Sequence, residues 1–554
     1  MKYTEEQQAI IEGSTDLEVG DIMKVNACAG SGKTSTCVGV AEANPDKLVL
    51  YLVFNKNMQE EAKKKFPNNV TVKTIHSLAY YYTMYNNGEN GKPVRTLRNK
   101  DYNVQELADI LIKEKIIQDN LNGKNLAFSL KRCMDGFYNS EYTDIEEYAK
   151  KFHSNMRAQT AVRFYQLLTD GKIDVTHSAY LKEFHILIKN NPMLLTDICD
   201  MIILDEAQDT NPVTWEIIKN TKTPLICVGD TNQNIYGFRE TFNVMENIEA
   251  KKEFKLTYNF RSNQNILDRA NSVIEVFKGK DDYKMISKAK FADGNDIKNE
   301  AIITRTNAKI VDILIKSLKG EMSLDKINLP RGVDSVFEYI VEYDKWRNTG
   351  KVSNISYKWL EKFKNEDDLK TNYIDKGLAE DEPELKATIQ MIDKYEGLYG
   401  KNIIRDAYEY ALKKSFEPVE KDTVNLLTAH TSKGLEFDKV TLTSDYRPLA
   451  DIYSQIGKAK PGKQRDDDMK AYTQEVNLAY VAFTRARKVL IDRSPLLENM
   501  MGFKLYCKDL EELKKDKVEQ KVKVADKEVV IPQKIAVTHR SKRKKQTFDN
   551  DIGF

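Results

Sequence analysis

The sequence predicts an α/β protein whose parallel sheets are interrupted by two mainly helical insertions. Short apolar runs rich in β-branched residues recur along the chain, and a helical pattern follows each of them. The runs are KLVLYLVFN (47–55), MIILDEA (201–207), PLICVGD (224–230), EAIITRT (300–306) and KVTLTSD (439–445). Such runs are typical of strands buried on both faces of a parallel sheet.

Size and composition limit the class of protein. A chain of 554 residues is too long for one hydrophobic core, so two to four domains are expected. Hydrophobic residues make up 41% of the chain, which is enough for packed interiors, and the net charge is only +2. Because the chain as a whole is not a polycation, any surface that binds nucleic acid must be a local patch.

The cysteines and the N-terminus predict a cytoplasmic protein. The six cysteines are scattered and show no C-x-x-C spacing, so neither a disulfide framework nor a zinc site is indicated. The stretch MKYTEEQQAI is charged and has no apolar core, unlike a signal peptide. No apolar run approaches the length of about 18 residues that a membrane span requires.

Two stretches break the alternation of strands and helices. Residues 90–195 and 309–422 are charged and aromatic with helical periodicity, as in VQELADILIKEKII (104–117) and NIIRDAYEYALKKSF (402–416). We interpret both as mainly helical insertions within α/β domains. The tail differs again, because residues 520–537 alternate like a small hairpin and a basic run, HRSKRKK (539–545), follows. That run could be a phosphate-binding arm or simply a solvated terminus.

The first chemical motif is VNACAGSGKTSTC (25–37), which follows an apolar start and precedes a predicted helix. Gly30 and Gly32 allow the backbone to turn its N–H groups toward phosphate oxygens. Lys33 should reach the β- and γ-phosphates, and Thr34 should reach a magnesium ion. Ala27 replaces the first glycine of the usual G-x-x-x-x-G-K-T pattern. The motif predicts a P-loop.

A second motif, MIILDEAQD (201–209), ends a predicted buried strand in two carboxylates. Asp205 can hold magnesium directly or through water, and Glu206 can orient and deprotonate an attacking water molecule. An acidic pair after a strand is common by chance, but its occurrence with a P-loop indicates an NTPase.

A third stretch, CVGDTNQNIYGFRE (227–240), combines two kinds of side chain. Asp230 and Gln233 suit phosphate, metal and water, whereas Tyr236 and Phe238 suit the flat face of a base. We interpret the loop as a mechanical link. A change that Gln233 senses would move the base that Phe238 holds. Arg239 is expected to brace the loop or a phosphate.

These motifs belong to a longer series. In chain order it reads TEEQQ (4–8), ACAGSGKT (27–34), VFNKNMQEEA (53–62), VKTIHSLA (72–79), ILDEAQD (203–209), VGDTNQNIYGFRE (228–240), LTYNFRSNQNIL (256–267), LLTAHTSKGLEFDKV (426–440) and AYVAFTRARK (479–488). In this order the chain resembles superfamily 1 DNA helicases of the UvrD/Rep/PcrA type. The resemblance covers both motor domains but not clearly the insertions or the tail.

The resemblance implies two RecA-like P-loop domains with ATP and Mg²⁺ in the cleft between them and single-stranded DNA across their top. The first domain would comprise residues 1–89 and 196–255, with the helical insertion at 90–195. The second would comprise residues 256–308 and 423–495, with the insertion at 309–422. Residues 496–554 would form a C-terminal extension.

Nucleotide-binding residues carry over by position. Gln7 matches the glutamine that contacts adenine, and Glu436 would lie near the sugar or the interdomain cleft. Arg261 and Arg485 match two arginines that the second domain directs at the γ-phosphate. Either Tyr258 or Phe260 would stack on adenine. The full nucleotide and catalytic set is Gln7, Ala29, Gly30, Ser31, Gly32, Lys33, Thr34, Ser35, Asp205, Glu206, Gln233, Arg261, Glu436 and Arg485, with Thr34 and Asp205 as the metal ligands.

The residues that the resemblance places near the DNA strand are Phe54, Asn55, Thr74, His76, Tyr236, Phe238, Thr428, His430 and Lys433. Aromatic faces can hold bases without reading their identity. Phe238 stands where the family often has tryptophan. His76 and His430 could instead be ordinary polar residues at strand ends.

The resulting prediction is an ATP-dependent DNA helicase or translocase, moving 3′ to 5′, that acts on single-stranded and duplex or fork DNA in replication, recombination or repair. The alternative is an ATP-gated DNA-binding remodelling factor that displaces proteins with little unwinding. The final DNDIGF (549–554) resembles the acidic tails by which single-strand binding proteins recruit partners. It suggests a replication or repair protein as a partner.

Overall fold

The computed structural model describes residues 2–85, 94–98, 100–116, 120–235, 243–279, 284–291, 296–374, 383–415, 423–457 and 463–504. Contacts divide the chain into two compact units, Met1–Glu498 and Asn499–Phe554. The elements below all belong to the first unit. Among the described helices, none is both long enough and apolar enough to cross a membrane.

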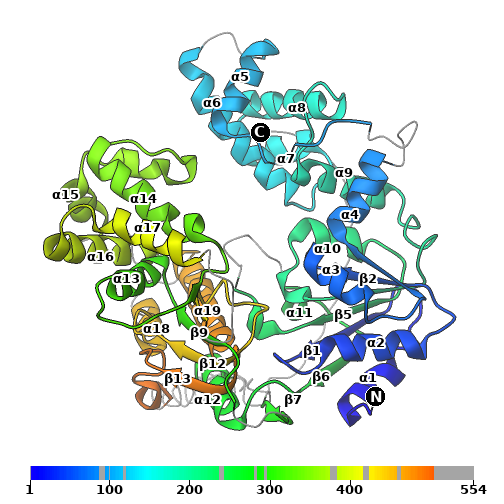
Figure 1. Ribbon diagram of the computed structural model, residues 1–554. Helices are drawn as coiled ribbons and strands as arrows, with labels where there is room; N and C mark the ends of the chain where they lie inside the picture. The colour runs from blue at the N-terminus through cyan, green and yellow to red at the C-terminus, as the bar shows by residue number, and fades with distance from the viewer. Residues whose placement is uncertain are drawn as a thin grey trace, which may run out of the picture. The chain divides into compact units, whose positions relative to one another are not determined.

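The first sheet has six parallel strands in the order β3-β2-β4-β5-β1-β6. Figure 1 labels β2, β5, β1 and β6 of this sheet. The strands are β1 (Ile22–Ala27), β2 (Val49–Val53), β3 (Val70–Thr74), β4 (Met201–Leu204), β5 (Leu225–Gly229) and β6 (Lys252–Leu256). β2, β4 and β5 are buried along their whole length. This burial explains why their sequences are continuous apolar runs rather than alternating ones.

Each buried strand serves two cores. Val49, Tyr51 and Val53 of β2 pack in a cluster with residues of the helices α1 (Glu5–Gly13), α2 (Lys33–Ala43) and α3 (Lys56–Lys63). Leu50 and Leu52 point to the opposite face and join a second cluster with α4 (Ile75–Tyr80) and α10 (Pro212–Lys219). Successive side chains of a strand alternate between the two faces of the sheet. One short apolar strand therefore packs against the helices on both faces.

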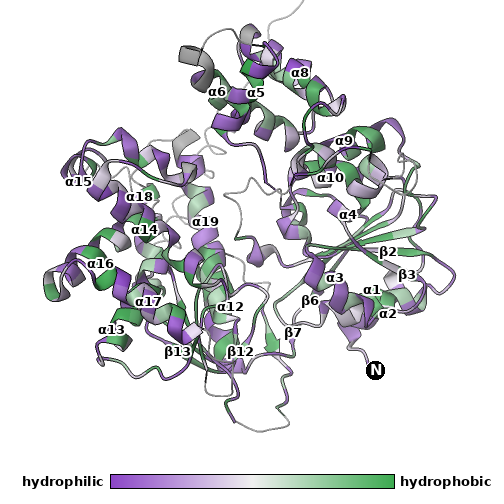
Figure 2. Cartoon of the chain, turned by 45° about the horizontal axis from the view of Figure 1, so that its top comes forward, coloured by the Kyte–Doolittle hydropathy of each residue, from purple (hydrophilic) through white to green (hydrophobic). Residues whose placement is uncertain are grey.

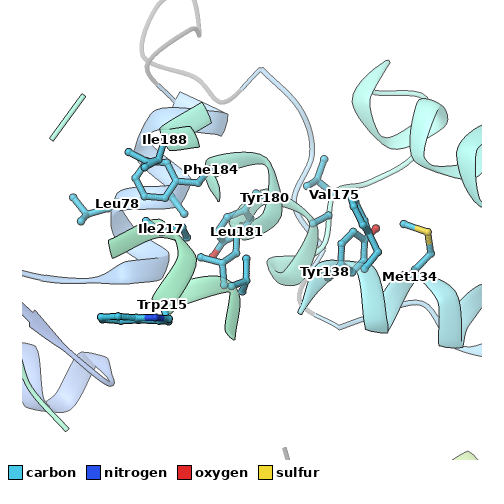
Figure 3. Close-up of a cluster of buried hydrophobic side chains, with 14 of the residues drawn as sticks. Leu78, Met134, Tyr138, Val175, Tyr180, Leu181, Phe184, Ile188, Trp215 and Ile217 are labelled. Carbon is cyan, nitrogen blue, oxygen red and sulfur yellow. The ribbon is translucent and has the colours of Figure 1, made fainter. Parts of the chain in front are cut away.

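The first helical region lies between β3 and β4 in the chain. It contains α5 (Val104–Lys113), α6 (Asn120–Tyr138), α7 (Ile145–Phe152), α8 (Asn155–Thr169) and α9 (His177–Asn190), after a π-helical turn at Tyr81–Tyr85. Figure 3 shows Tyr180, Leu181 and Phe184 of α9 in one apolar cluster with Leu78 and Trp215. The helical region therefore shares a core with the sheet.

The second sheet has five parallel strands in the order β10-β11-β9-β12-β13. The strands are β9 (Glu300–Thr304), β10 (Ile327–Asn328), β11 (Val424–Thr428), β12 (Phe437–Leu442) and β13 (Ala486–Asp492). A separate parallel pair is formed by β7 (Tyr258–Asn259) and β8 (Ile286–Ser287). The helices of this part of the chain are α12 (Gln264–Lys278), α13 (Asn307–Leu318), α18 (Leu449–Gly457) and α19 (Lys463–Phe483). The short α11 (Val244–Asn247) lies between β5 and β6 and packs in the core of the first sheet.

The second helical region contains α14 (Val333–Thr349), α15 (Glu366–Leu369), α16 (Pro383–Tyr399) and α17 (Ile403–Ser415). Its core includes the fully buried Trp346 and Tyr343 together with Ile302 of β9 and Leu426 of β11. These helices carry hydrophobic and hydrophilic residues side by side (Figure 2), as expected of elements with one buried face.

The predicted fold class is confirmed, because the chain contains two parallel sheets with helical regions. The five predicted strands are present as β2, β4, β5, β9 and β12. The short strand β10 lies within the second stretch that was expected to be mainly helical. Tyr236, Phe238, Arg239, the expected hairpin at 520–537, the basic run and the final acidic segment lie outside the described residues.

Candidate active site

A cleft of about 920 Å³ opens where β1, β4 and β5 end. In a parallel sheet the carboxyl ends of the strands meet at one edge, which is where ligands bind in open α/β folds. The predicted nucleotide and catalytic residues all line this cleft: Gln7, Ala29, Gly30, Ser31, Gly32, Lys33, Thr34, Ser35, Asp205, Glu206, Gln233, Arg261, Glu436 and Arg485. The tertiary structure therefore brings the whole predicted set together, although what each residue does there stays a prediction.

The loop between β1 and α2 has the backbone geometry of an anion cradle. Gly30 and Gly32 have φ values of +70° and +81°, in the left-handed region that favours glycine. A Cβ atom on Gly30 would lie 2.6 Å from Cβ of Arg261. No side chain caps α2 at Gly32, so its first N–H groups remain available for phosphate oxygens.

Two carboxylates and a lysine face one another at the base of the cleft. Lys33 Nζ lies 2.9 Å from Glu206 Oε1. Burial disfavours the charge on Lys33, but the carboxylates of Glu206 and Asp205 outweigh it and raise the pKa of Lys33. The pKa of Glu206 falls to about 2 despite burial, because Lys33 and Lys433 favour its ionised form. Glu206 is therefore a carboxylate at neutral pH.

Asp205 is held differently. Its Oδ2 accepts a hydrogen bond of 2.5 Å from the hydroxyl of Tyr51, and its Oδ1 accepts one from the N–H of Glu206. Burial and the adjacent Glu206 raise the pKa of Asp205. A carboxylate whose charge is disfavoured in this way is a favourable place for a cation. With the Thr34 hydroxyl in the same cleft, the oxygen donors fit Mg²⁺.

Gln208 joins the two loops that follow β4 and β5. Its Nε2 donates to Glu206 Oε2 at 2.7 Å, and its Oε1 accepts from the N–H of Asp230 at 3.0 Å. Asp230 in turn accepts a hydrogen bond of 2.8 Å from Gln233 Nε2. Glu206 and Gln233 are thus joined by one series of hydrogen bonds through Gln208 and Asp230, including the Asp230 backbone N–H. No role for Gln208 was predicted from the sequence.

Lys433 enters the cleft from the segment after β11. Its ammonium forms an ion pair with Asp209 and donates to the backbone oxygen of Gln233 at 2.7 Å. Only 10% of the Lys433 side chain and 4% of the Asp209 side chain are exposed. The resemblance placed Lys433 near DNA, whereas the structure places it among the nucleotide-facing residues, so its contact with DNA stays a prediction.

The two predicted arginines lie outside the first sheet, Arg261 just after β7 and Arg485 just before β13. Arg261 Nε lies 2.6 Å from Glu436 Oε2. Arg485 is buried and donates to the backbone oxygens of Val481 and Leu435 and to the Thr484 hydroxyl. Burial and the nearby Arg261 lower the pKa of Arg485 to about 9. A buried guanidinium in this state would be stabilised by an anion in the cleft.

An aromatic side chain completes the cleft. Phe260 lines it with 43% of its surface exposed, and its ring faces the position of Gly32. Tyr258 does not line the cleft, and its ring lies under Lys288 Nζ at 4.9 Å. Phe260 is therefore the better placed of the two candidates for adenine. The sequence signal for it was only its position before Arg261.

Gln7 has a structural task as well as a place in the cleft. Its Oε1 accepts from the N–H of Thr4, and Thr4 Oγ1 accepts from the N–H of Gln7, so the TEEQ sequence forms a capping box for α1. Its Nε2 donates to Thr36 at 3.1 Å. The predicted contact with adenine is untested.

The predicted DNA-contacting residues fall into several places. Phe54, 52% exposed, lines both the nucleotide cleft and a second cavity of about 390 Å³ that also includes His76. Asn55 and Thr74 cap α3 and α4 with their side-chain oxygens. Thr428 ends β11 and bonds Thr431. Of the predicted DNA-contacting residues, Phe54, Asn55 and Lys433 line the nucleotide cleft together.

The two histidines are neutral at physiological pH. Burial and the neighbouring His177 lower the pKa of His76 to about 4, and its Nδ1 lies 3.1 Å from the Tyr180 hydroxyl. Burial and Arg305 lower the pKa of His430 to about 4. A neutral imidazole can exchange hydrogen bonds but adds no charge toward a phosphate backbone.

Comparison with known proteins adds an independent line of evidence. The model of the UvrD/REP helicase N-terminal domain matches residues 4–255, and that of the UvrD-like helicase C-terminal domain matches residues 343–491. F-box DNA helicase 1 of Gallus gallus is 28% identical over 541 residues, covering 91% of this chain and 50% of that protein.

Two further relatives are also named DNA helicases. F-box DNA helicase protein 1 of Schizosaccharomyces pombe is 28% identical, covering 88% of this chain and 57% of its own length. DNA helicase II of Escherichia coli is 25% identical over 305 residues, covering 49% of this chain and 40% of that protein. The chain thus spans about half the length of the two F-box helicases.

Proposed function

This chain belongs to the UvrD/Rep family of helicases, and from that premise we propose that it is an ATP-dependent DNA helicase. The observation that carries the proposal is the cleft, which is lined by a P-loop, two carboxylates, Gln233 and two arginines that lie just after β7 and just before β13. Charge that develops on a transferred phosphoryl group needs such cations, and one arginine of this kind contributes on the order of 10³–10⁵ in rate.

The side chains divide the work as follows. Lys33 and the N-terminus of α2 bind the β- and γ-phosphates. Glu206, ionised at neutral pH, orients and deprotonates the attacking water, while Gln233 is placed to sense the γ-phosphate. Thr34 and Asp205 would hold Mg²⁺, which neutralises phosphate charge when bound. Arg261 and Arg485 complete the site only when the second sheet closes on the nucleotide.

The proposed substrate is single-stranded DNA, on which the protein moves 3′ to 5′ and opens duplexes. The direction rests on the style of the motifs GDTNQNIYGFR and HTSKGLEF. Phe54 supports the DNA assignment, since it is half exposed beside Glu206 and Asp209 in the two adjoining cavities. An exposed aromatic ring there can stack on a base and couple strand movement to the cleft.

A strand-displacement assay tests the function. Duplexes with a 3′ tail, with a 5′ tail and with blunt ends are incubated with ATP and Mg²⁺, and hydrolysis is followed in parallel. We expect displacement on the 3′-tailed duplex. The Lys33→Ala and Glu206→Gln variants should lose hydrolysis by a factor of roughly 10²–10⁴ while single-strand binding persists.

Each other outcome has a distinct meaning. Displacement only on the 5′-tailed duplex would reverse the proposed polarity. DNA-stimulated hydrolysis without displacement on any duplex would favour the ATP-gated remodelling factor. Near-parental turnover by Glu206→Gln would refute the assignment of Glu206 as the base.

A further inference from the structure

Tyr480 of α19 contacts both nucleotide-facing loops of the first sheet with one hydroxyl group. The Ala29 N–H of the P-loop donates to Tyr480 Oη at 3.3 Å. The same hydroxyl donates to Asp230 Oδ2 at 2.9 Å and lies 3.4 Å from Met285 Sδ. Tyr480, Asp230 and Ala29 are all buried. The Tyr480 hydroxyl thus accepts one hydrogen bond from the P-loop and donates one to Asp230.

The carboxylate oxygen that Tyr480 contacts also holds the predicted γ-phosphate sensor. Asp230 Oδ2 accepts from Gln233 Nε2 at 2.8 Å, while Asp230 Oδ1 accepts from the N–H of Asn232 at 3.0 Å. The position of the Gln233 amide therefore depends on a carboxylate that Tyr480 helps to fix.

Neighbouring contacts fasten the same two loops. Asn477, one turn before Tyr480 on α19, donates to the backbone oxygen of Asn234 at 2.7 Å. Lys278 at the end of α12 donates to Asn232 Oδ1 at 2.8 Å. On the P-loop, Asn259 Nδ2 donates to the Ala29 oxygen and the N–H of Phe260 donates to the Gly30 oxygen. Residues of α12, of α19 and of the segment at β7 thus bind the P-loop and the loop after β5.

We propose that Tyr480 is a positioning residue that joins the P-loop to the Gln233 loop, so that the two take their hydrolytic arrangement only while α19 lies against them. This inference rests on the proposed ATP hydrolysis in the same cleft. The tyrosine hydroxyl is essential to it, because phenylalanine would keep the ring but leave the buried Ala29 N–H without its acceptor. Tyr480 does not line the cleft, so it acts through Asp230 and the loop backbone.

The Tyr480→Phe variant tests the proposal. We expect the kcat of DNA-stimulated ATP hydrolysis to fall about tenfold with KM for ATP changed less than about twofold, since binding uses Lys33 and α2, and a tenfold fall corresponds to about 1.4 kcal/mol. Tyr472→Phe is the matched control. Tyr472 is also on α19 and buried, but its hydroxyl donates to the Phe277 backbone oxygen at 3.2 Å, away from both loops.

A double-variant cycle with Gln233→Ala separates positioning from loss of stability. If Tyr480 acts through Gln233, the combined variant should lose little more activity than Gln233→Ala alone. Parental kcat in Tyr480→Phe, an equal loss in Tyr472→Phe, or additive losses in the cycle would each overturn the proposal. Hydrolysis without strand displacement by the parent protein would count against the helicase function while leaving this test intact. Absence of hydrolysis in the parent would overturn both.

Discussion

Glu206 occupies an unfavourable backbone conformation at the centre of the cleft. Its φ of +50° lies in the left-handed region, where only two other described non-glycine residues occur. Such a conformation costs on the order of 1–3 kcal/mol and persists where the surroundings hold it. Here Lys33 and Gln208 bind its carboxylate, and Asp205 binds its N–H. These contacts hold Glu206 in this conformation at the wall of the cleft.

At the scale of the single residue, we expect Phe260 to contribute to ATP binding rather than to ATP hydrolysis. We expect Phe260→Ala to raise KM for ATP about tenfold, because aromatic stacking on a base is worth roughly 1–3 kcal/mol, with kcat changed less than about twofold. Steady-state ATP hydrolysis with saturating single-stranded DNA measures both constants.

Tyr258→Ala is the matched control for Phe260→Ala, since the Tyr258 ring lies under Lys288 outside the cleft. It should leave KM unchanged. An increase in KM for a Tyr258→Ala variant, without one for Phe260→Ala, would assign adenine stacking to the other aromatic.

At the scale of elements, α9 connects the first helical region to the sheet and buries two basic side chains. Lys182 and His185 are both fully buried among residues of the shared core. Lys182 Nζ donates to the Ser140 backbone oxygen at 2.7 Å and lies 4.6 Å from the Phe137 ring centroid. Burial lowers the pKa of Lys182 to about 7. The helix therefore carries a group whose charge opposes folding.

This predicts a pH dependence of stability with a definite sign. Between about pH 7 and the unfolded lysine value of about 10.4, the unfolded chain binds more protons, so the contribution of Lys182 to stability rises with pH. From pH 7.5 to 9.5 this amounts to on the order of 2 kcal/mol. The Lys182→Met variant lacks this contribution. The difference between the Tm of the parent and the Tm of the variant should therefore increase from pH 7.5 to pH 9.5.

Lys189→Met, at an exposed lysine of the same helix, is the matched control for thermal unfolding. Its Tm should run parallel to that of the parent across the pH series. If the Tm of Lys182→Met also runs parallel to the Tm of the parent, the buried Lys182 ammonium stays protonated across this pH range.

At the scale of the whole molecule, the two sheets are joined through the nucleotide cleft. Lys433 pairs with Asp209 across it, Tyr480 bonds Ala29 and Asp230, and Arg485 lines it from the turn between α19 and β13. A ligand that contacts both sides adds its binding free energy to the stability of the joined arrangement.

We therefore expect a non-hydrolysable ATP analogue with Mg²⁺ to raise the Tm, with about 2.7 kcal/mol of stabilisation at a hundredfold excess over Kd. In Arg485→Ala the analogue should bind roughly tenfold more weakly, because a buried cation facing the phosphates is lost. Thermal unfolding over an analogue titration measures this.

Arg269→Ala provides the comparison for Arg485→Ala. Arg269 pairs with Asp492 at 2.7 Å and does not line the cleft, so the response to the analogue should match that of the parent. Equal analogue-induced stabilisation in the Arg485 variant would refute contact between this arginine and the nucleotide.

Much of the fold and of the cleft could be predicted because their signals are local. The continuous apolar runs of β2, β4 and β5 follow from burial on both faces. The P-loop is recognisable because its glycines meet a backbone requirement within a few residues. Six strands of the two sheets, namely β1, β3, β6, β10, β11 and β13, were not among the five predicted runs. The partly exposed β3 and the two-residue β10 carry little periodicity.

The sequence by itself determined which chemical groups are present and in what order, and hence the parallel α/β fold and the nucleotide-facing set. Only the tertiary structure decided which partner each group takes. Ala29 and Tyr480 lie 451 positions apart, yet they share a hydrogen bond. Lys433 bonds Asp209 and Gln233 rather than lying apart from the nucleotide residues. Partners of this kind depend on how two sheets and their loops pack, and no pattern of spacing along the chain records that packing.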